Sequence, residues 1–372
     1  RLCRDWSSDV CSSDLPKQPT QSLKEAFGDM FVFGTALNEG QILGTDTVVL
    51  DLIHKHFNSI TAENVMKSQY VQPQEGVFEW ELSDKFVEFG EKHNMHIVGH
   101  TLIWHSQSPD WFFVDENGND VSREVLIERM RNHIHTVVGR YKGRVHGWEV
   151  VNEAILDDGS WRPTKFYQII GPEFVEYAFR FAHEADPAAN LYYNDYNTYK
   201  PTKRQGIVDM VKNLQANGVK IDGIGMQGHV NLIFPTMEDF ENSLLAFHGL
   251  GVDVMITELD ITVLPWPTGP VTADVALNMA YNKELNPYAE GLPEDVALEL
   301  HNRFMDFFNK FIEHQDKISR VTMWGTVDHH SWRNNWPVRG RTDYALLFDR
   351  NYAPKPVVQE IINAALAARE VQ

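Results

Sequence analysis

Short runs of apolar residues alternate with longer amphipathic stretches along the chain from Pro16 onward. Runs of this length are typical of strands, and the stretches between them repeat apolar residues at the helical spacing of three to four positions. We expect strands over residues 31–37, 59–63, 96–104, 145–153, 190–194, 223–229, 252–261 and 321–328. We expect helices over residues 84–93, 123–141, 174–185, 203–217, 237–250, 293–314 and 357–369.

Strands that alternate with helices in this way, without a linker, predict an α/β fold in which the strands are parallel and close into a (β/α)8 TIM barrel. We therefore expect a single catalytic barrel domain over residues 16–372, with its active site at the C-terminal ends of the strands. The segment 265–291 is rich in Pro, Asn and Gly and is long for a loop. Because long loops in compact domains tend to be functional, we expect this one to edge a substrate cleft.

Residues 1–15 do not follow this pattern. They hold the chain's two cysteines, Cys3 and Cys11, and an imperfect repeat in which Trp-Ser-Ser-Asp-Val is followed by Cys-Ser-Ser-Asp-Leu. The segment resembles a translated DNA-sequencing adapter, so we expect a non-native leader, with a natural disordered leader as the alternative. The other residues contain no cysteine, which excludes disulfides, thiolate zinc sites and a cysteine nucleophile among them.

The charge balance restricts the class of partner. The chain has 372 residues, 33 Lys and Arg against 52 Asp and Glu, and a formal net charge of −19. A surface this acidic repels phosphate backbones, so we expect no nucleic acid partner. No apolar run is long enough to predict a membrane span. Ten tryptophans exceed what a core usually needs, which indicates that some indoles face a ligand.

Polar and aromatic residues collect where the predicted strands end, although a barrel interior built for stability would use Val, Ile and Leu. Burying so many polar groups costs free energy unless they bind each other or a ligand. The period of two along a strand places Glu258 and Asp260 on one face. The residues at the other strand ends are Asn152 and Glu153, Gln227 and His229, His100 and Trp104, and Trp324 with Asp328, Ser331 and Trp332.

Two glutamates among indoles, amides and imidazoles indicate acid and base chemistry on a sugar, whose C–H faces stack on aromatic rings. Glycoside hydrolysis needs one protonated and one ionised carboxyl group, and Glu153 and Glu258 form the best pair. No phosphate-binding or dinucleotide motif is present, so we expect no cofactor. We also expect no metal. A metal hydrolase is the weaker alternative, built from His100, His105, His229, His329, His330 and Asp328, whereas His133 and His135 are expected to be solvated.

Several strings resemble those of glycoside hydrolase family 10, and they occur in the family's order from about Leu23 to Pro356. They are Asn58 to Asn64 with Met66-Lys67, Gly99 to His105, Trp148 to Ala154, Gln227-Gly228-His229, Thr257 to Asp260, and Trp324-Gly325 with Ser331-Trp332. The resemblance implies an endo-1,4-β-xylanase that cleaves internal bonds of xylan with retention of configuration. The expected partners are xylan and xylo-oligosaccharides, and we expect a monomer.

The same resemblance implies roles for individual residues. Glu153 would be the acid/base and Glu258 the nucleophile, with carboxyl groups about 5–5.5 Å apart as retention requires. Asn152 would contact the sugar 2-hydroxyl, and His229, oriented by Asp260, would hold the nucleophile. Substrate-binding roles are implied for Gln227, His100, Trp104, Trp324 and Trp332 around the cleaved sugar, for Glu63, Asn64 and Lys67 around the next sugar, and for Tyr196 on the leaving-group side.

Two further alternatives remain at this point. One is a glycosidase of the same barrel clan that acts on β-1,4-glucan, and the other is a noncatalytic polysaccharide-binding barrel. Because a cell cannot take up xylan intact, we expect the protein to be secreted, periplasmic or on the cell surface.

Overall fold

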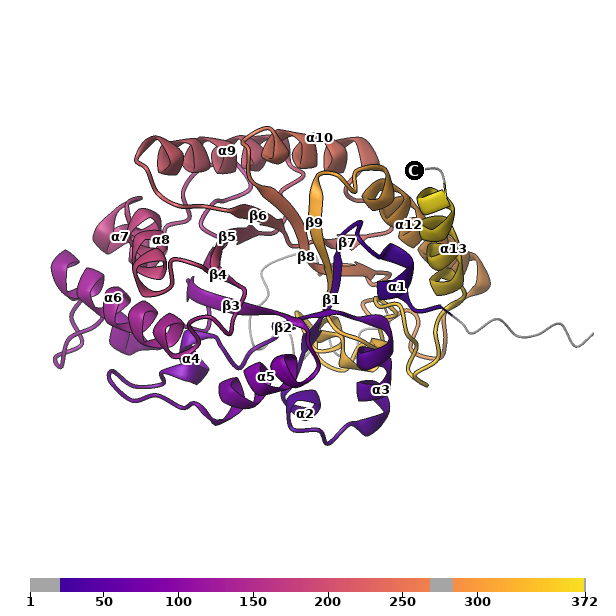
Figure 1. Ribbon diagram of the computed structural model, residues 1–372, viewed down its shortest axis with the longest axis horizontal. Coiled ribbons are helices and arrows are strands. Elements are labelled where there is room, and N and C mark those ends of the chain that lie inside the picture. The colour runs from indigo at the N-terminus through magenta and orange to yellow at the C-terminus, as the bar shows by residue number, and fades with distance from the viewer. Residues whose placement is uncertain (1–20, 268–283, 371–372) are drawn as a thin grey trace, which may run out of the picture.

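The computed structural model describes residues 21–267 and 284–370, in which strands and helices alternate along the chain (Figure 1). The strands are β1 (Val32–Leu37), β2 (Ser59–Ala62), β3 (His96–Trp104), β4 (Gly147–Asn152), β5 (Asn190–Asp195), β6 (Gly223–Met226), β7 (His229–Asn231), β8 (Asp253–Thr262) and β9 (Ile318–Met323). The α-helices are α1 (Leu23–Phe27), α2 (Glu39–Ile42), α3 (Thr47–His56), α4 (Ser68–Val71), α5 (Glu81–Lys92), α6 (Arg123–Arg140), α7 (Lys165–Ile170), α8 (Phe174–Ala185), α9 (Pro201–Ala216), α10 (Met237–His248), α12 (Glu294–Glu313) and α13 (Pro356–Glu370). Short 3-10 helices lie in the loops as η1 (Asp110–Phe112), η2 (Asp328–His330) and η3 (Trp332–Asn334).

Eight of these strands form a closed ring. Their order is β6, β5, β4, β3, β2, β1, β9, β8, and β8 returns to pair with β6. All neighbouring strands are parallel, so each connection must cross from one end of the ring to the other, and the helices that surround the strands in Figure 1 provide these crossovers. The predicted (β/α)8 TIM barrel is confirmed.

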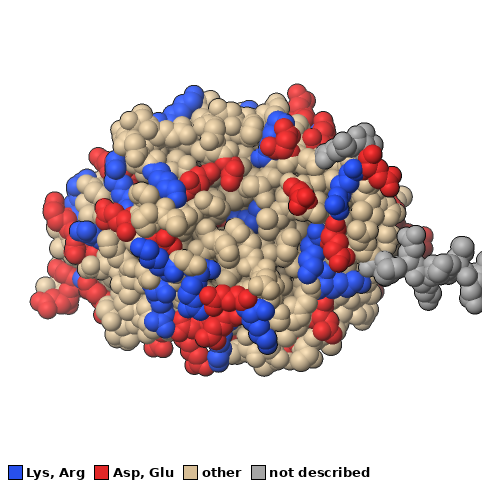
Figure 2. All heavy atoms as spheres, viewed as in Figure 1, with Lys and Arg blue, Asp and Glu red and all other residues tan. Residues whose placement is uncertain are grey.

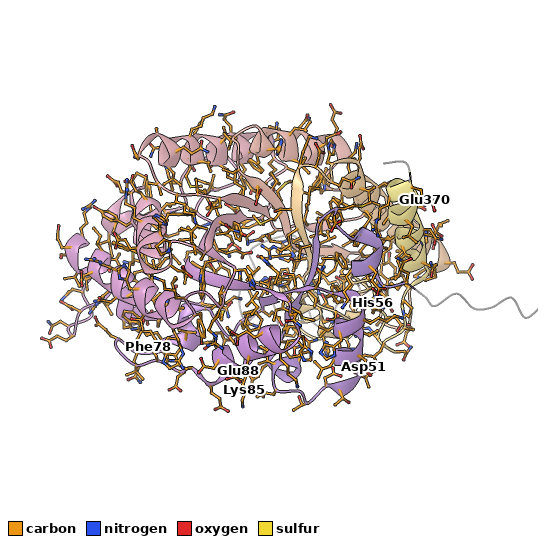
Figure 3. All side chains as sticks on the ribbon, in the orientation of Figure 1. Asp51, His56, Phe78, Lys85, Glu88 and Glu370 are labelled. Carbon is orange, nitrogen blue, oxygen red and sulfur yellow. The ribbon has the colours of Figure 1, made fainter. Side chains whose placement is uncertain are left out.

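The helices pack their apolar faces onto the strands. On α5, Phe86 and Val87 are buried, whereas Lys85 and Glu88 lie at the outer edge of the molecule (Figure 3). The first and last helices of the ring, α1 and α13, lie side by side, and Arg369 on α13 donates a hydrogen bond to the carbonyl oxygen of Glu25 at 2.9 Å. The two ends of the barrel sequence therefore meet beside the same strands.

The predicted sixth strand, 223–229, is broken in the structure. It ends at Met226, and a short strand β7 begins at His229 and pairs with the far half of β8. Gly228 between them has a φ of 84°, a left-handed conformation that favours glycine and turns the chain out of the extended form. The predicted eighth strand, 321–328, lies instead at Ile318–Met323. Both differences bring polar residues out of strands and into loops over the barrel.

The prediction that His133 is solvated is wrong. Its side chain lies on the buried face of α6, and its Nδ1 is 2.7 Å from Oε1 of Gln72. Burial lowers the pKa of His133 to about 4, so the ring is neutral. Charged neighbours along the sequence masked this face of the helix. His135 keeps an exposed side chain and contacts Glu184 at 3.0 Å.

Residues 1–15, predicted to be a leader, lie outside the described residues, as does most of the predicted cleft loop 265–291. Within the part of the chain that the structure describes, no helix has both the length and the apolar character needed to cross a bilayer. On the face drawn in Figure 2, acidic and basic side chains are interspersed around a largely uncharged centre.

Candidate active site

The polar strand ends predicted from the sequence meet above one end of the barrel. Asn152 is the last residue of β4, and Glu153 follows it directly. Glu258 and Asp260 lie in the second half of β8, and Gln227 and His229 flank the break between β6 and β7. Since the strands are parallel, their carboxyl ends share one rim of the ring, which is why residues distant in sequence gather there.

Glu258 is held at both carboxylate oxygens. Its Oε1 accepts a hydrogen bond from Nδ2 of Asn194 at 2.7 Å, and its Oε2 lies 3.0 Å from Nε2 of His229. Burial alone would raise the pKa of Glu258, but the hydrogen bond from His229 and the charges of His100 and His229 bring that pKa below its ordinary value. Glu258 is thus a buried, ionised carboxylate that two donors hold in a fixed orientation.

His229 bridges two carboxylates. Its Nδ1 is 3.0 Å from Oδ2 of Asp260 on the side opposite Glu258. Burial opposes a charged imidazolium, yet Asp260 and Glu258 together raise the pKa of His229 to about 9. The ring is therefore protonated at neutral pH and donates to both partners.

Asp260 is the anchor of this chain of contacts. It accepts hydrogen bonds from Nε1 of Trp332 at 2.8 Å and from Nε of Arg333 at 2.7 Å. Despite burial, the charges of Arg333 and His229 lower the pKa of Asp260. Trp332 packs beside His229 with ring centroids 5.0 Å apart, so one carboxylate fixes both the imidazole and an indole. Arg333 was not singled out from the sequence, although it directly follows a predicted site residue.

Among the described residues, the hydrogen-bond donors to the Glu153 carboxyl group reach one of its two oxygens. Its Oε1 accepts from Nε2 of Gln227 at 3.0 Å and from Nδ2 of Asn152 at 3.4 Å, and its Oε2 is 3.9 Å from Nε2 of His105. The Glu153 side chain is 13% exposed, against 6% for Glu258. A carboxyl group at the edge of the site, with acceptor positions left open, can exchange a proton with a substrate or with water.

Asn194 connects the two glutamates, and the sequence analysis missed it. Its Nδ2 lies within hydrogen-bond distance of Glu258 Oε1 and, at 3.2 Å, of Asn152 Oδ1, and its Oδ1 accepts from Thr257 at 2.6 Å. The available signal was its position, because Asn194 is a polar residue at the end of a predicted strand. Tyr196, two residues later, was the residue of this segment predicted to bind substrate.

A buried pair and two indole rings gather around His100 of β3, from β3, β4 and the residue after β9. His100 Nδ1 lies 2.6 Å from Oε2 of Glu149, and both side chains are buried. Trp324 packs edge-on against His100 with centroids 5.2 Å apart, and Trp104 lies 6.4 Å from His100. The indole Nε1 of Trp104 is buried and has no hydrogen-bond partner within the described part of the chain. An unpaired donor at this place is available to a ligand.

Glu63, Asn64 and Lys67 lie together after β2. Lys67 Nζ donates to Oδ1 of Asn64 at 2.9 Å and to Oε1 of Gln107 at 2.8 Å, and it sits 4.8 Å from the centroid of the Trp104 ring. Burial lowers the pKa of Lys67 and raises that of Glu63. These groups continue the polar surface from β3 toward β2.

Tyr196 lies on the other side of Glu153. Its hydroxyl accepts a hydrogen bond from Nη2 of Arg162 at 2.7 Å, and Nε of Arg162 donates to the carbonyl oxygen of Glu153 at 2.8 Å. A cavity of about 420 Å³ opens beside this group, lined by His105, Phe113, Leu156, Arg162, Pro163, Thr164, Lys165 and Phe166. The cavity is large enough for a sugar ring and borders the acid side of the site.

The residues weighed for a metal site do not form one cluster among those that the structure describes. His100 groups with Glu149 and Glu258, whereas His329 and His330 group with Asp46. In the second group, His330 already bonds through both nitrogens, to Gln41 at 3.2 Å and to Asp46 at 3.2 Å. The ligand set of the metal-hydrolase alternative is therefore dispersed, with His105, His229 and Asp328 in neither group.

Comparisons with known proteins identify a family that the chain matches over most of its length. The model of glycosyl hydrolase family 10 matches residues 22–364. An endo-1,4-beta-xylanase A of Xylanibacter ruminicola is 50% identical over 345 residues, covering 93% of each chain. An endo-1,4-beta-xylanase of Geobacillus stearothermophilus is 41% identical, covering 95% of this chain and 100% of that one. The solved structure of a GH10 endoxylanase from a sugarcane soil metagenome has a TM-score of 0.87 and 46% identity, covering 93% and 99%.

Proposed function

Because the chain belongs to glycosyl hydrolase family 10, we propose that it is an endo-1,4-β-xylanase that hydrolyses internal β-1,4 bonds of xylan with retention of configuration. The observation that supports this most directly is the connection between the two glutamates. Asn152 and Gln227 bind Glu153, and Asn194 joins Asn152 to Glu258. Two carboxyl groups in one network, one ionised and one partly open, are what double displacement requires.

In the first step, the Glu258 carboxylate attacks the anomeric carbon and forms a covalent ester with it. The bond from that carbon to the leaving oxygen breaks, and Glu153 gives its proton to this oxygen. In the second step, Glu153 takes a proton from water, the water oxygen bonds to the anomeric carbon, and Glu258 is released. Each step inverts the carbon, so the product keeps the original configuration.

Asn152 and His229 support these steps. The Oδ1 of Asn152 accepts from Asn194 and from Gln227 at 3.2 and 3.1 Å, which fixes the amide. One N–H of its Nδ2 faces Glu153 Oε1, and the other can donate to the sugar 2-hydroxyl. His229 donates to Glu258 and keeps it ionised before attack. Xylose lacks the hydroxymethyl group of glucose, and Trp332, fixed by Asp260, would occupy the space that this group needs.

We propose that the substrate-binding roles implied by the family resemblance apply to this chain. We assign His100, Trp104, Gln227, Trp324 and Trp332 to the sugar at the cleaved bond. We assign Glu63, Asn64 and Lys67 to the next sugar and Tyr196 to the leaving-group side. We further propose that the protein acts as a monomer. We also propose that it acts outside the cytoplasm, because a cell cannot take up polymeric xylan intact.

The decisive experiment compares hydrolysis of xylan and of carboxymethylcellulose by the wild type, Glu153→Ala and Glu258→Ala. Glu88→Ala, on the outer face of α5, is the matched control (Figure 3). We expect xylo-oligosaccharides from the wild type and the control alone, and little cleavage of the glucan. Because general acid catalysis contributes roughly 10²–10⁴-fold, Glu153→Ala should lose about that much on xylan and much less on aryl xylosides with good leaving groups. Undiminished xylan cleavage by either catalytic variant would contradict the assignment.

A further inference from the structure

The main chain at Glu153 is in an unusual conformation. Its φ is 61°, in the left-handed region that residues other than glycine rarely adopt. This conformation costs about 1–2 kcal/mol for an ordinary residue and persists only where surrounding contacts hold it. The conformation turns the chain sharply out of β4, and this sets where the carboxyl group of Glu153 lies.

The contacts that hold this turn come from β5. The N–H of Glu153 donates to the carbonyl oxygen of Asn194 at 2.9 Å. The N–H of Ala154 donates to the hydroxyl of Tyr193 at 2.9 Å, and the N–H of Ile155 lies 3.4 Å from Oδ2 of Asp195. Three consecutive amides are thus bound by three consecutive residues of one neighbouring strand.

Two of these three contacts depend on Asp195. The Tyr193 hydroxyl donates its own proton to Oδ2 of Asp195 at 2.5 Å, which turns its lone pair toward Ala154. Asp195 is fully buried, and burial raises its pKa to about 6. Its Oδ1 lies 2.7 Å from Nζ of Lys203, which is also fully buried. The ammonium group favours the ionised, accepting form of Asp195.

Lys203 reaches Asp195 because α9 lies against the loop that follows β4. A Cβ atom at Gly206, one turn after Lys203, would lie 2.4 Å from the carbonyl oxygen of Gly159, so the close approach requires glycine. The same ammonium group sits 3.7 Å from the centroid of the Tyr196 ring. A buried ion pair adds little net stability compared with apolar packing. This pair does, however, hold the amides of the two residues that follow Glu153, Ile155 directly and Ala154 through Tyr193, and it also contacts Tyr196 on the leaving-group side of the site.

We propose that Lys203, acting through Asp195 and Tyr193, is a positioning residue that holds the main chain of Glu153 in the left-handed turn. This inference rests on the proposed role of Glu153 as acid and base. Its consequence is selective. Loss of the network displaces the group that moves protons and leaves the attacking carboxylate of Glu258, which is held by other residues, in place.

The test uses Lys203→Met, which keeps an unbranched apolar side chain one atom shorter and removes the charged ammonium group. The substrates are xylan, phenyl β-xylobioside and 2,4-dinitrophenyl β-xylobioside, whose leaving group needs no proton. Because a displacement of about 1 Å can cost about 100-fold, we expect kcat/KM to fall roughly 10–100-fold on xylan and on the phenyl substrate. On the dinitrophenyl substrate, kcat/KM should change less than about threefold. Azide, a nucleophile that needs no base, should raise turnover of the dinitrophenyl substrate by the variant and not by the wild type.

Tyr193→Phe is the second variant. It removes one hydroxyl oxygen and keeps the buried ring, so it tests the network even where Lys203→Met fails to fold. We expect the same selectivity between leaving groups, of smaller size.

Lys355→Met is the matched control, because Lys355 forms a comparable ion pair with buried Asp328 at 2.9 Å in the loop after β9. The pKa of Asp328 is likewise raised by burial to about 6. We expect this control to lose thermal stability and to keep the wild-type ratio between the phenyl and dinitrophenyl substrates.

The outcomes separate the inference from the proposed function. Should Glu153→Ala itself leave the ratio between the two leaving groups unchanged, the assignment of Glu153 as acid is wrong. Should Glu153→Ala change the ratio while folded Lys203→Met and Tyr193→Phe do not, the positioning role is wrong. Equal losses on both aryl substrates, or the same ratio change in Lys355→Met, would also overturn it.

Discussion

Glu258 and Glu153 lie on the same rim of the barrel and both are bound through their main chains, but their carboxyl groups are held differently. Both carboxylate oxygens of Glu258 are bound, one by Asn194 and one by His229. Within the described part of the chain, two amide donors reach the carboxyl group of Glu153, both at Oε1, and its N–H and C=O are bound by Asn194 and Arg162. A nucleophile must stay ionised and aimed, so donors to its oxygens serve it. A group that gains and loses a proton needs one oxygen free of donors, so its position depends more on the turn of the main chain.

The contacts that hold Glu258 form the nucleophile's arm, and those that hold Glu153 form the acid's arm. Asn194 belongs to both, because its side chain binds Glu258 and its carbonyl oxygen binds the N–H of Glu153. Substitutions that reach only one arm can therefore separate them. Loss of the nucleophile's support should slow all substrates alike, because every leaving group needs the attack. Loss of the acid's support should depend on the leaving group.

The largest effect is expected for Asp260→Asn. This change removes the charge that orients His229 and fixes Trp332 and Arg333. We expect kcat/KM to fall roughly 10²–10³-fold, equally on phenyl and dinitrophenyl β-xylobioside. The measurement is steady-state kinetics on both substrates, with Asp253→Asn at the opposite end of β8 as the control. A loss confined to the phenyl substrate would break the distinction drawn between the two arms.

A smaller effect is expected for Asn194→Ala. The variant loses the side-chain donor to Glu258 and keeps the carbonyl oxygen that binds the N–H of Glu153. A hydrogen bond to a charged group is worth about 1.5–3 kcal/mol, so we expect a loss of about 10–100-fold on both aryl substrates. Asn190→Ala, at the start of the same strand, is the control. If azide restored the activity of Asn194→Ala, the side chain would belong to the acid's arm instead.

The smallest effect concerns pH. His229 has an ordinary pKa of 6.5, raised to about 9 in the folded protein by Asp260 and Glu258 against the cost of burial. A basic group whose pKa is raised on folding adds stability that is complete below pH 6.5 and is lost as the pH rises to about 9. We expect the thermal midpoint of the wild type to fall across this window and that of His229→Asn to fall less, by calorimetry. Parallel decreases in both proteins would show that His229 is not the titrating group.

The barrel could be predicted because its pattern is repeated. Each strand and helix carries its own periodicity, and β3 and α8 were predicted at the residues where they occur. The break at Gly228 could not be predicted, since it depends on pairing with β8, which is distant in sequence. The burial of His133 could not be predicted for a related reason, because its partner Gln72 lies directly after α4 and is distant in sequence.

The candidate site was predictable where residue type and strand position coincide, as for Glu153, Glu258 and Asp260. The role of Asp195, at the end of β5, depends on its contact with Lys203. Lys203 could not be predicted as a site residue, because a charged residue in a helix is usually solvated. Its burial here follows from a contact between α9 and the loop after β4, which no local pattern encodes. The sequence therefore predicts the reacting groups better than it predicts the groups that hold them.

The contact between α1 and α13 has a consequence for engineering. Since Arg369 reaches back to Glu25, a short peptide could join these helices, and the chain could be opened at an exposed surface turn such as the one after α5. Every strand would keep both neighbours in such a circular permutant. The order in which the ribosome makes the eight units would change, while the finished ring and the chemistry on its rim would stay the same.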